Sequence, residues 1–212
     1  MTHTLHRRGK SEDLCEDFVL LIRISRGINQ EGSEDKMRRI WEILSRYEAD
    51  LVNFGNHNPN WGEGELYDME ALKKADSRII HAVFKDRDKL KACLNEIKDG
   101  DFGISVVISG LYEETKKICS EIGLKPHTVN HSLGSHGKTE LLPEADVMEI
   151  HTMCGHAMVS ANLISHMAKD IDTGKTTCKD AAKKLCRMCD CGIFNTYRAE
   201  IILNRMTRKQ QR

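Results

Sequence analysis

The chain of 212 residues lacks the features that mark membrane, secreted and nucleic-acid-binding proteins. No apolar run approaches the roughly 20 residues of a membrane span, and the polar segment 1–10 lacks the apolar core of a secretory signal. Its 32 basic residues balance 32 acidic ones, so no net field attracts nucleic acid or an anionic lipid surface. Aromatic residues make up only 5%, which leaves little surface for stacking on unpaired bases. We therefore expect a cytoplasmic protein that contacts neither nucleic acid nor membrane.

A phosphate-binding loop of the Walker A type is also absent from the sequence. The triplet Gly-Lys-Thr occurs at 137–139 and again at 174–176. The motif needs a second glycine five residues before the first, and Ser132 and Lys169 stand at those positions. The sequence therefore argues against a nucleoside triphosphatase.

Cysteine is what the sequence does contain, with eight residues of which five lie at or after position 154. Thiols in the cytosol stay reduced, so an even count is not evidence for disulfides. Cys186, Cys189 and Cys191 follow a CxxCxC spacing, and Cys154 lies upstream in a Met-Cys-Gly-His sequence. Thiolates gathered in this way are typical of a soft or borderline metal site, because each donates strongly and several share the charge of the cation.

The spacing of the cysteines favours an iron–sulfur cluster over zinc. A structural zinc site usually shows two CxxC knuckles or one knuckle with paired histidines, whereas a [4Fe–4S] cluster accepts ligands from unrelated elements. We expect Cys154, Cys189 and Cys191 to be the ligands, with Cys186 either a fourth ligand or a bystander. Three cysteines would leave one iron open to substrate. Zinc, or buried thiols without metal, are the alternatives, and Cys189 could then simply fill a helical core.

Other residues are candidates for chemistry at neutral pH. His156 lies two residues after Cys154 and could be a ligand, a hydrogen-bond partner of a ligand, or a packing residue. His131, His136 and Lys138 lie in one polar segment and could act as acid, base or anion-binding groups, although ordinary loop residues have the same pattern. None of these features settles whether the protein is an enzyme.

Arg26 and Asn29 follow the first expected strand, where they could position a substrate. Their exposure at a loop is equally typical of ordinary turn residues. The Gly-, Asn- and Pro-rich stretch 55–64 is expected to be either a binding loop or a mobile one.

Alternation of strand and helix patterns predicts an α/β fold with a mixed or mostly parallel sheet and flanking helices, over 13–145. After Pro143 the apolar spacing is helical throughout, which predicts a small all-helical cap over 146–212 that carries the cysteines. The expected strands cover 17–25, 52–54, 78–84, 103–109 and 128–133, and the helices between them include 88–97 and 111–122.

The segments 153–160 (MCGHAMVS) and 189–195 (CDCGIFN) resemble a family of uncharacterised proteins from anaerobic archaea and bacteria, and 127–143 is also similar. Cys186 is outside that pattern. The resemblance implies an iron–sulfur protein of anaerobic metabolism, whose partner would be a small molecule or a redox protein. It could be an enzyme with an open iron site between the cap and the α/β domain. The alternative is a zinc-stapled or metal-free protein-interaction module.

Overall fold

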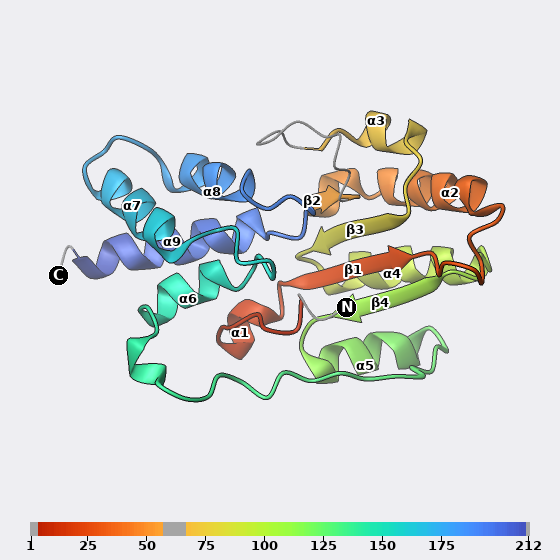
Figure 1. Cartoon of the computed structure of the whole chain (residues 1–212), viewed down its shortest axis with the longest axis horizontal. Coiled ribbons are helices and arrows are strands. Elements are labelled where there is room, and N and C mark those ends of the chain that lie inside the picture. The colour runs from red at the N-terminus through yellow and green to blue at the C-terminus, as the bar shows by residue number, and fades with distance from the viewer. Residues whose placement is uncertain (1–3, 57–66, 211–212) are drawn as a thin grey trace.

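The computed structural model describes residues 4–56 and 67–210, and most of the stretch 55–64 lies outside these ranges. Its sheet contains β1 (Phe18–Arg23), β2 (Leu51–Gly55), β3 (Ile79–Phe84) and β4 (Ser105–Ser109), in the order β2-β3-β1-β4. All three neighbouring pairs are antiparallel, with Leu20 opposite Ala82 on one side and opposite Ile108 on the other. Figure 1 shows this sheet at one end of the molecule.

The expectation of a mixed or mostly parallel sheet is therefore wrong. Helix α2 (Ser33–Ser45) joins β1 to β2, and helix α4 (Arg87–Asp99) joins β3 to β4. Each crossover does make its two strands run in the same direction, but a strand of opposite direction lies between them. This is the split β-α-β arrangement, repeated twice. The expected fifth strand over 128–133 is absent too, because that segment is exposed and carries no strand.

One face of the sheet packs against α2, α4 and the short α3 (Met69–Lys74) to form the first core. Alternate residues of β1, namely Phe18, Leu20 and Ile22, point into this core, as the period of a strand requires. Trp41 of α2 is fully buried there, and its Nε1 donates to the hydroxyl of Ser77 at 3.1 Å. Helix α5 (Tyr112–Glu121) follows β4.

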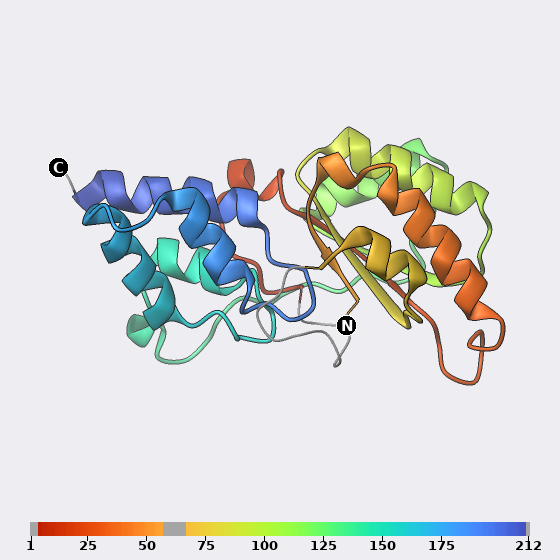
Figure 2. The ribbon, with the colours of Figure 1, turned by 90° about the horizontal axis from the view of Figure 1, so that it is seen from above.

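A second core lies among the helices α6 (Ala145–His151), α7 (Ala161–Asp172), α8 (Cys178–Cys186) and α9 (Thr196–Gln210). Val19 and Val83 join this core from the opposite face of the sheet, so the helices dock directly on the strands. Figure 2 shows these helices gathered at one end of the molecule, with the sheet and α2 to α5 at the other. Short helical turns at α1 (Ser11–Leu14), Glu48–Asp50 and Thr139–Leu141 complete the described elements. Within the described ranges, no helix has the length and apolarity to cross a membrane.

Candidate metal centre

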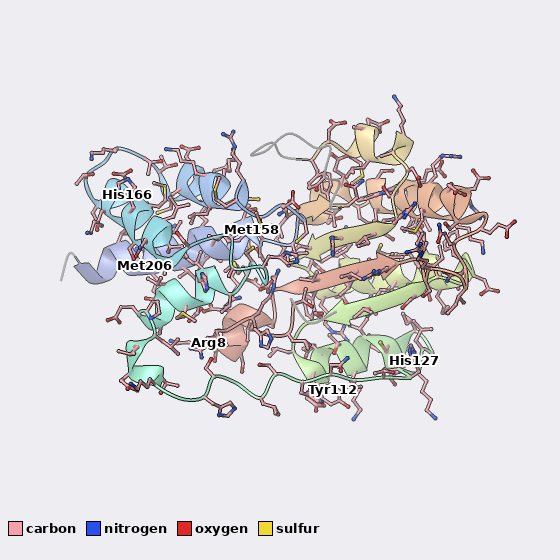
Figure 3. All side chains as sticks on the ribbon, in the orientation of Figure 1. Arg8, Tyr112, His127, Met158, His166 and Met206 are labelled. Atoms are coloured by element: carbon pink, nitrogen blue, oxygen red, sulfur yellow. The ribbon has the colours of Figure 1, made fainter. Side chains whose placement is uncertain are left out.

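Two loops of the helical region bring four cysteines together where it meets the sheet. Cys154 lies in the turn that follows α6, and Cys186 is the last residue of α8. Cys189 and Cys191 lie in the loop between α8 and α9. All four side chains are buried, with exposures of 6% or less. Met158, labelled in Figure 3, marks the position of the Cys154 turn between the helices and the sheet.

Three of these thiols and one imidazole form a continuous series of contacts. Cys154 and Cys189 interact with each other, and the interaction shifts the pKa of both thiols. The Sγ atoms of Cys189 and Cys191 are 4.0 Å apart, and Cys191 Sγ is 3.7 Å from Nδ1 of His156. Cys186 stands beside this series and interacts electrostatically with Cys154 and Cys189. The structure thus gathers the cysteines and the histidine that the sequence pattern singled out.

The backbone around the thiols supplies hydrogen-bond donors that favour a thiolate. The backbone amides of His156 and Met158 act to lower the pKa of Cys154, and the backbone amide of Ile193 acts to lower that of Cys189. Ala157 adopts φ +57°, a left-handed conformation that costs energy for a residue with a Cβ. The turn therefore holds a strained backbone while it directs two amides at one sulfur.

Crowding of the thiols has the opposite effect on their acidity. The hydrogen bond with Cys189 and then burial raise the pKa of Cys154, and burial raises the pKa of Cys186 to about 12. The hydrogen bond from Cys154 lowers the pKa of Cys189, but contact with Cys191 and burial outweigh it and raise this pKa to about 12. These three groups are neutral thiols at pH 7 until a cation offsets the cost of placing negative charges side by side.

The loop between α8 and α9 is fastened to the edge strand β2. Asn53 donates its amide to the carbonyl of Phe194 at 3.0 Å and to Sγ of Cys186 at 3.3 Å. The hydroxyl of Tyr67 donates to the carbonyl of Asp190 at 2.6 Å. Gly192 has φ +74°, and a Cβ there would lie 2.3 Å from the carbonyl oxygen of Phe54. Only glycine fits this close approach, so the position of the cysteine loop depends on it.

A buried arginine near the N-terminus holds both cysteine loops. Arg7 donates to the carbonyl of Met153 at 3.2 Å, to the carbonyl of Ile193 and to the carboxylate of Asp17. Asp17 is buried and also accepts from Arg198 at 2.9 Å. No spacing rule links Arg7 to the cysteines, because more than 140 residues separate them.

Two of the spacings between donors are closer to those around a single tetrahedral ion than to those around a cubane cluster. Metal–sulfur bonds of about 2.3 Å in a zinc tetrahedron place two thiolates about 3.8 Å apart and a thiolate about 3.6 Å from an imidazole nitrogen. The contacts of Cys191 with Cys189 and His156 are close to these values. A cubane binds each thiolate through a different iron, so the sulfurs would have to move apart. Within the described part of the chain, no group of three or more His, Cys, Asp or Glu side chains is placed to hold a metal ion, so Cys154, Cys189, Cys191 and His156 would have to move together to form a site.

Arg26 and Asn29 lie away from the cysteines. They follow the C-terminal end of β1, whereas Asp17, at its other end, touches the cysteine loops through Arg7. Asn29 holds its own turn, since its side chain accepts from the amide of Ser25 at 2.6 Å and donates to the carbonyl of Gly103 at 2.8 Å. Arg26 is exposed. In an antiparallel sheet the C-terminal ends of neighbouring strands point in opposite directions, so they do not form one substrate edge.

His131, His136 and Lys138 lie on an exposed segment between α5 and α6. The ring of His131 packs edge-on against Tyr112 with centroids 5.0 Å apart, at an open cleft of about 1090 Å³ between β4, α5 and this segment. Figure 1 shows the segment running beneath α5, far from the loop that joins α8 to α9. The three polar residues and the thiols therefore do not share one pocket.

Comparisons of the chain with protein-family models, with curated proteins and with solved structures gave no match.

Proposed function

We propose that the protein is a metal-binding protein in which a thiolate centre joins two loops of the helical region, the turn after α6 and the loop between α8 and α9. Cys154, Cys189 and Cys191 are the sulfur ligands and His156 is the fourth ligand. The observation that carries this proposal is the buried series of contacts from Cys154 through Cys189 and Cys191 to His156.

Two physical arguments support a metal over plain burial of thiols. The thiol of Cys191 lies 4.0 Å from that of Cys189 and 3.7 Å from Nδ1 of His156, a grouping of soft donors that a core-filling cysteine does not need. The loops that carry the ligands are also fixed from outside, by Asn53, Tyr67 and Arg7. Fixed loops lower the cost of bringing ligands together on binding.

Zinc is the metal that the observed spacings favour, and it would act as a structural centre. It would join the turn after α6 to the loop before α9 and so close the second core around Cys191. The zinc centre would then have a structural role and take no part in chemistry. As a zinc-stapled module, the protein would present a rigid surface to a partner protein.

A [4Fe–4S] cluster is the second candidate, and one observation favours it. Cys186 places a further thiol beside the other three. With Cys154, Cys189 and Cys191 as its only protein thiolates, a cluster would supply an open iron for a small molecule. With Cys186 added, it would suit electron exchange with a redox partner.

Elemental analysis of the full chain purified without oxygen separates these possibilities. About one zinc per chain supports the structural centre, whereas about four irons with four sulfides and broad absorption near 400 nm support the cluster. Cys154→Ser and Cys191→Ser should abolish metal retention, and Cys15→Ser, at an exposed position, should leave it unchanged. Wild-type protein that retains neither metal after reconstitution would overturn the proposal.

A further inference from the structure

The N-terminal segment contributes a residue that touches both loops of the proposed metal centre. Arg7 reaches the carbonyl of Met153, the residue before Cys154, at 3.2 Å. The same guanidinium reaches the carbonyl of Ile193, two residues after Cys191. These two carbonyls belong to segments about 40 residues apart, and one planar cation donates to both.

The guanidinium is itself held in place by a buried carboxylate. Arg7 pairs with Asp17, and the exposures of the two side chains are 6% and 0%. Asp17 also accepts from Asn195 at 3.0 Å and from Arg198 at 2.9 Å. A buried arginine with fixed acceptors loses little further entropy, and its five donors suit several acceptors in one plane. Lysine at this position could satisfy the charge of Asp17 but not both carbonyls.

We propose that Arg7 is the positioning residue of the metal centre, and this inference rests on the proposed function. It sets the distance between the turn that carries Cys154 and the loop that carries Cys189 and Cys191. Outer contacts of this kind orient the ligands before the metal arrives, and their removal typically weakens metal affinity about 10- to 100-fold. The N-terminal segment is thereby a part of the metal site, although it contains no ligand.

Two other arginines serve as matched controls. Arg8, labelled in Figure 3, directs its side chain to the hydroxyl of Ser135, at an exposed position. Arg205 pairs with Asp13 at 2.7 Å, with Asp146 at 3.0 Å and with Glu149 at 3.0 Å, in the same ionic network but without contact to a cysteine loop. Arg205→Met therefore reports a loss of stability that does not pass through the loops.

The test measures zinc affinity of the full chain by competition with a chromogenic chelator, alongside the thermal midpoint of each variant. Arg7→Met should weaken zinc binding about 10- to 100-fold, Arg7→Lys should weaken it less, and Arg8→Met should not change it. Arg205→Met should lower the midpoint while zinc affinity stays near wild type. Equal zinc affinity in Arg7→Met and wild type would overturn the proposal, as would an equal loss in Arg205→Met. If Arg7→Met does not fold, Arg7→Lys takes its place in the comparison.

A second measurement keeps this inference separate from the proposed function. If the wild-type chain binds no zinc, the proposed function fails, and alkylation of the metal-free chain is followed by mass spectrometry. Loosened loops should then expose Cys154 and Cys189 to the reagent faster in Arg7→Met than in Arg205→Met. Equal alkylation rates in these two variants would overturn the positioning role of Arg7, whether or not the protein binds zinc.

Discussion

The two hydrophobic cores of this protein differ in residue composition. The core between the sheet and α2 and α4 consists of large apolar side chains such as Phe18, Trp41 and Phe84, with Cys93 as its one cysteine among the described residues. The core of the helical region combines apolar side chains such as Ile164 and Phe194 with four cysteines and small residues such as Ala181. Beside it lies a buried ionic network that includes Arg198. Large apolar burial stabilises a core by itself, whereas small residues and thiols bury less area for each residue.

The comparison indicates that the helical region relies on directed interactions in addition to the apolar area that it buries. Removing one partner of a buried hydrogen bond or ion pair should therefore destabilise the helical region locally and strongly. Removing one partner of an exposed ion pair on the sheet side should destabilise the protein less. The expected effects can be ranked from the metal, through the ionic network, to a surface pair.

Metal removal should have the largest effect and should act on one region only. Structural zinc contributes on the order of 10–16 kcal/mol of apparent binding free energy in small domains. Chelation of zinc, or oxidation of a cluster in air, should therefore remove amide protection from α7, α8 and α9, while β1 and β3 keep theirs. Hydrogen exchange with mass spectrometry measures this difference. Uniform loss of protection in both regions would contradict the contrast between the cores.

Asp17→Asn should be the most damaging single substitution outside the cysteines. It leaves the buried guanidinium groups of Arg7 and Arg198 without their shared carboxylate, and such a loss costs about 3–5 kcal/mol. Denaturant unfolding measures the change. Glu96→Gln provides the control, because it removes a carboxylate from an exposed pair and should cost only a few tenths of a kcal/mol. A similar small cost for Asp17→Asn would show that the network adds no stability.

Cys186→Ala should have a smaller effect than Cys154→Ala on metal retention. Its thiol accepts from Asn53 at 3.3 Å and stands outside the series of contacts that ends at His156. We expect the variant to keep its metal and to lose about 1 kcal/mol of stability, because one buried hydrogen bond disappears. The metal content of the two variants, measured side by side, shows whether Cys186 is a ligand. Equal loss from both would indicate a site with four thiolates.

The smallest expected effect concerns acid stability of the sheet region. Hydrogen bonds from Tyr47 and then Arg46 lower the pKa of Glu96 in the folded protein. The pair therefore stabilises the fold above the unfolded pKa of about 4.3, and this contribution is lost as the pH falls through the lower folded pKa. Unfolding curves of wild type and Glu96→Gln should differ by a few tenths of a kcal/mol at pH 7 and converge near pH 2. A difference that grows towards low pH would contradict this sign.

Much of the local structure could be predicted from the sequence, because local patterns decide it. The strand patterns over 17–25, 78–84 and 103–109 and the helix pattern over 88–97 overlap β1, β3, β4 and α4 of the structure. The cysteine spacing also pointed to the segments whose thiols the structure brings into contact. The role of Cys154, Cys189 and Cys191 as metal ligands stays a prediction.

Strand order and direction could not be predicted in this way. A helix between two strands sets their common direction, but the chain between them carries no signal for the strand that inserts. The pairing of β1 with both β3 and β4 depends on contacts across more than 50 residues. The candidate substrate residues Arg26 and Asn29 could not be predicted for the same reason. Their assignment required the carboxyl ends of parallel strands to meet at one edge of the sheet, and an antiparallel sheet has no such edge.

The sequence by itself determined the approximate positions of β1, β3, β4 and α4, and which thiols could act together. Thr177 caps α8 by accepting from the amide of Asp180 at 3.1 Å, a contact set by three residues of spacing. Only the tertiary structure decided that Arg7 bridges the loops of Met153 and Ile193, and that Gly192 lies against Phe54. The reason is physical: capping and periodicity depend on neighbours in the chain, whereas a guanidinium finds its acceptors only after the folded backbone has placed them in one plane.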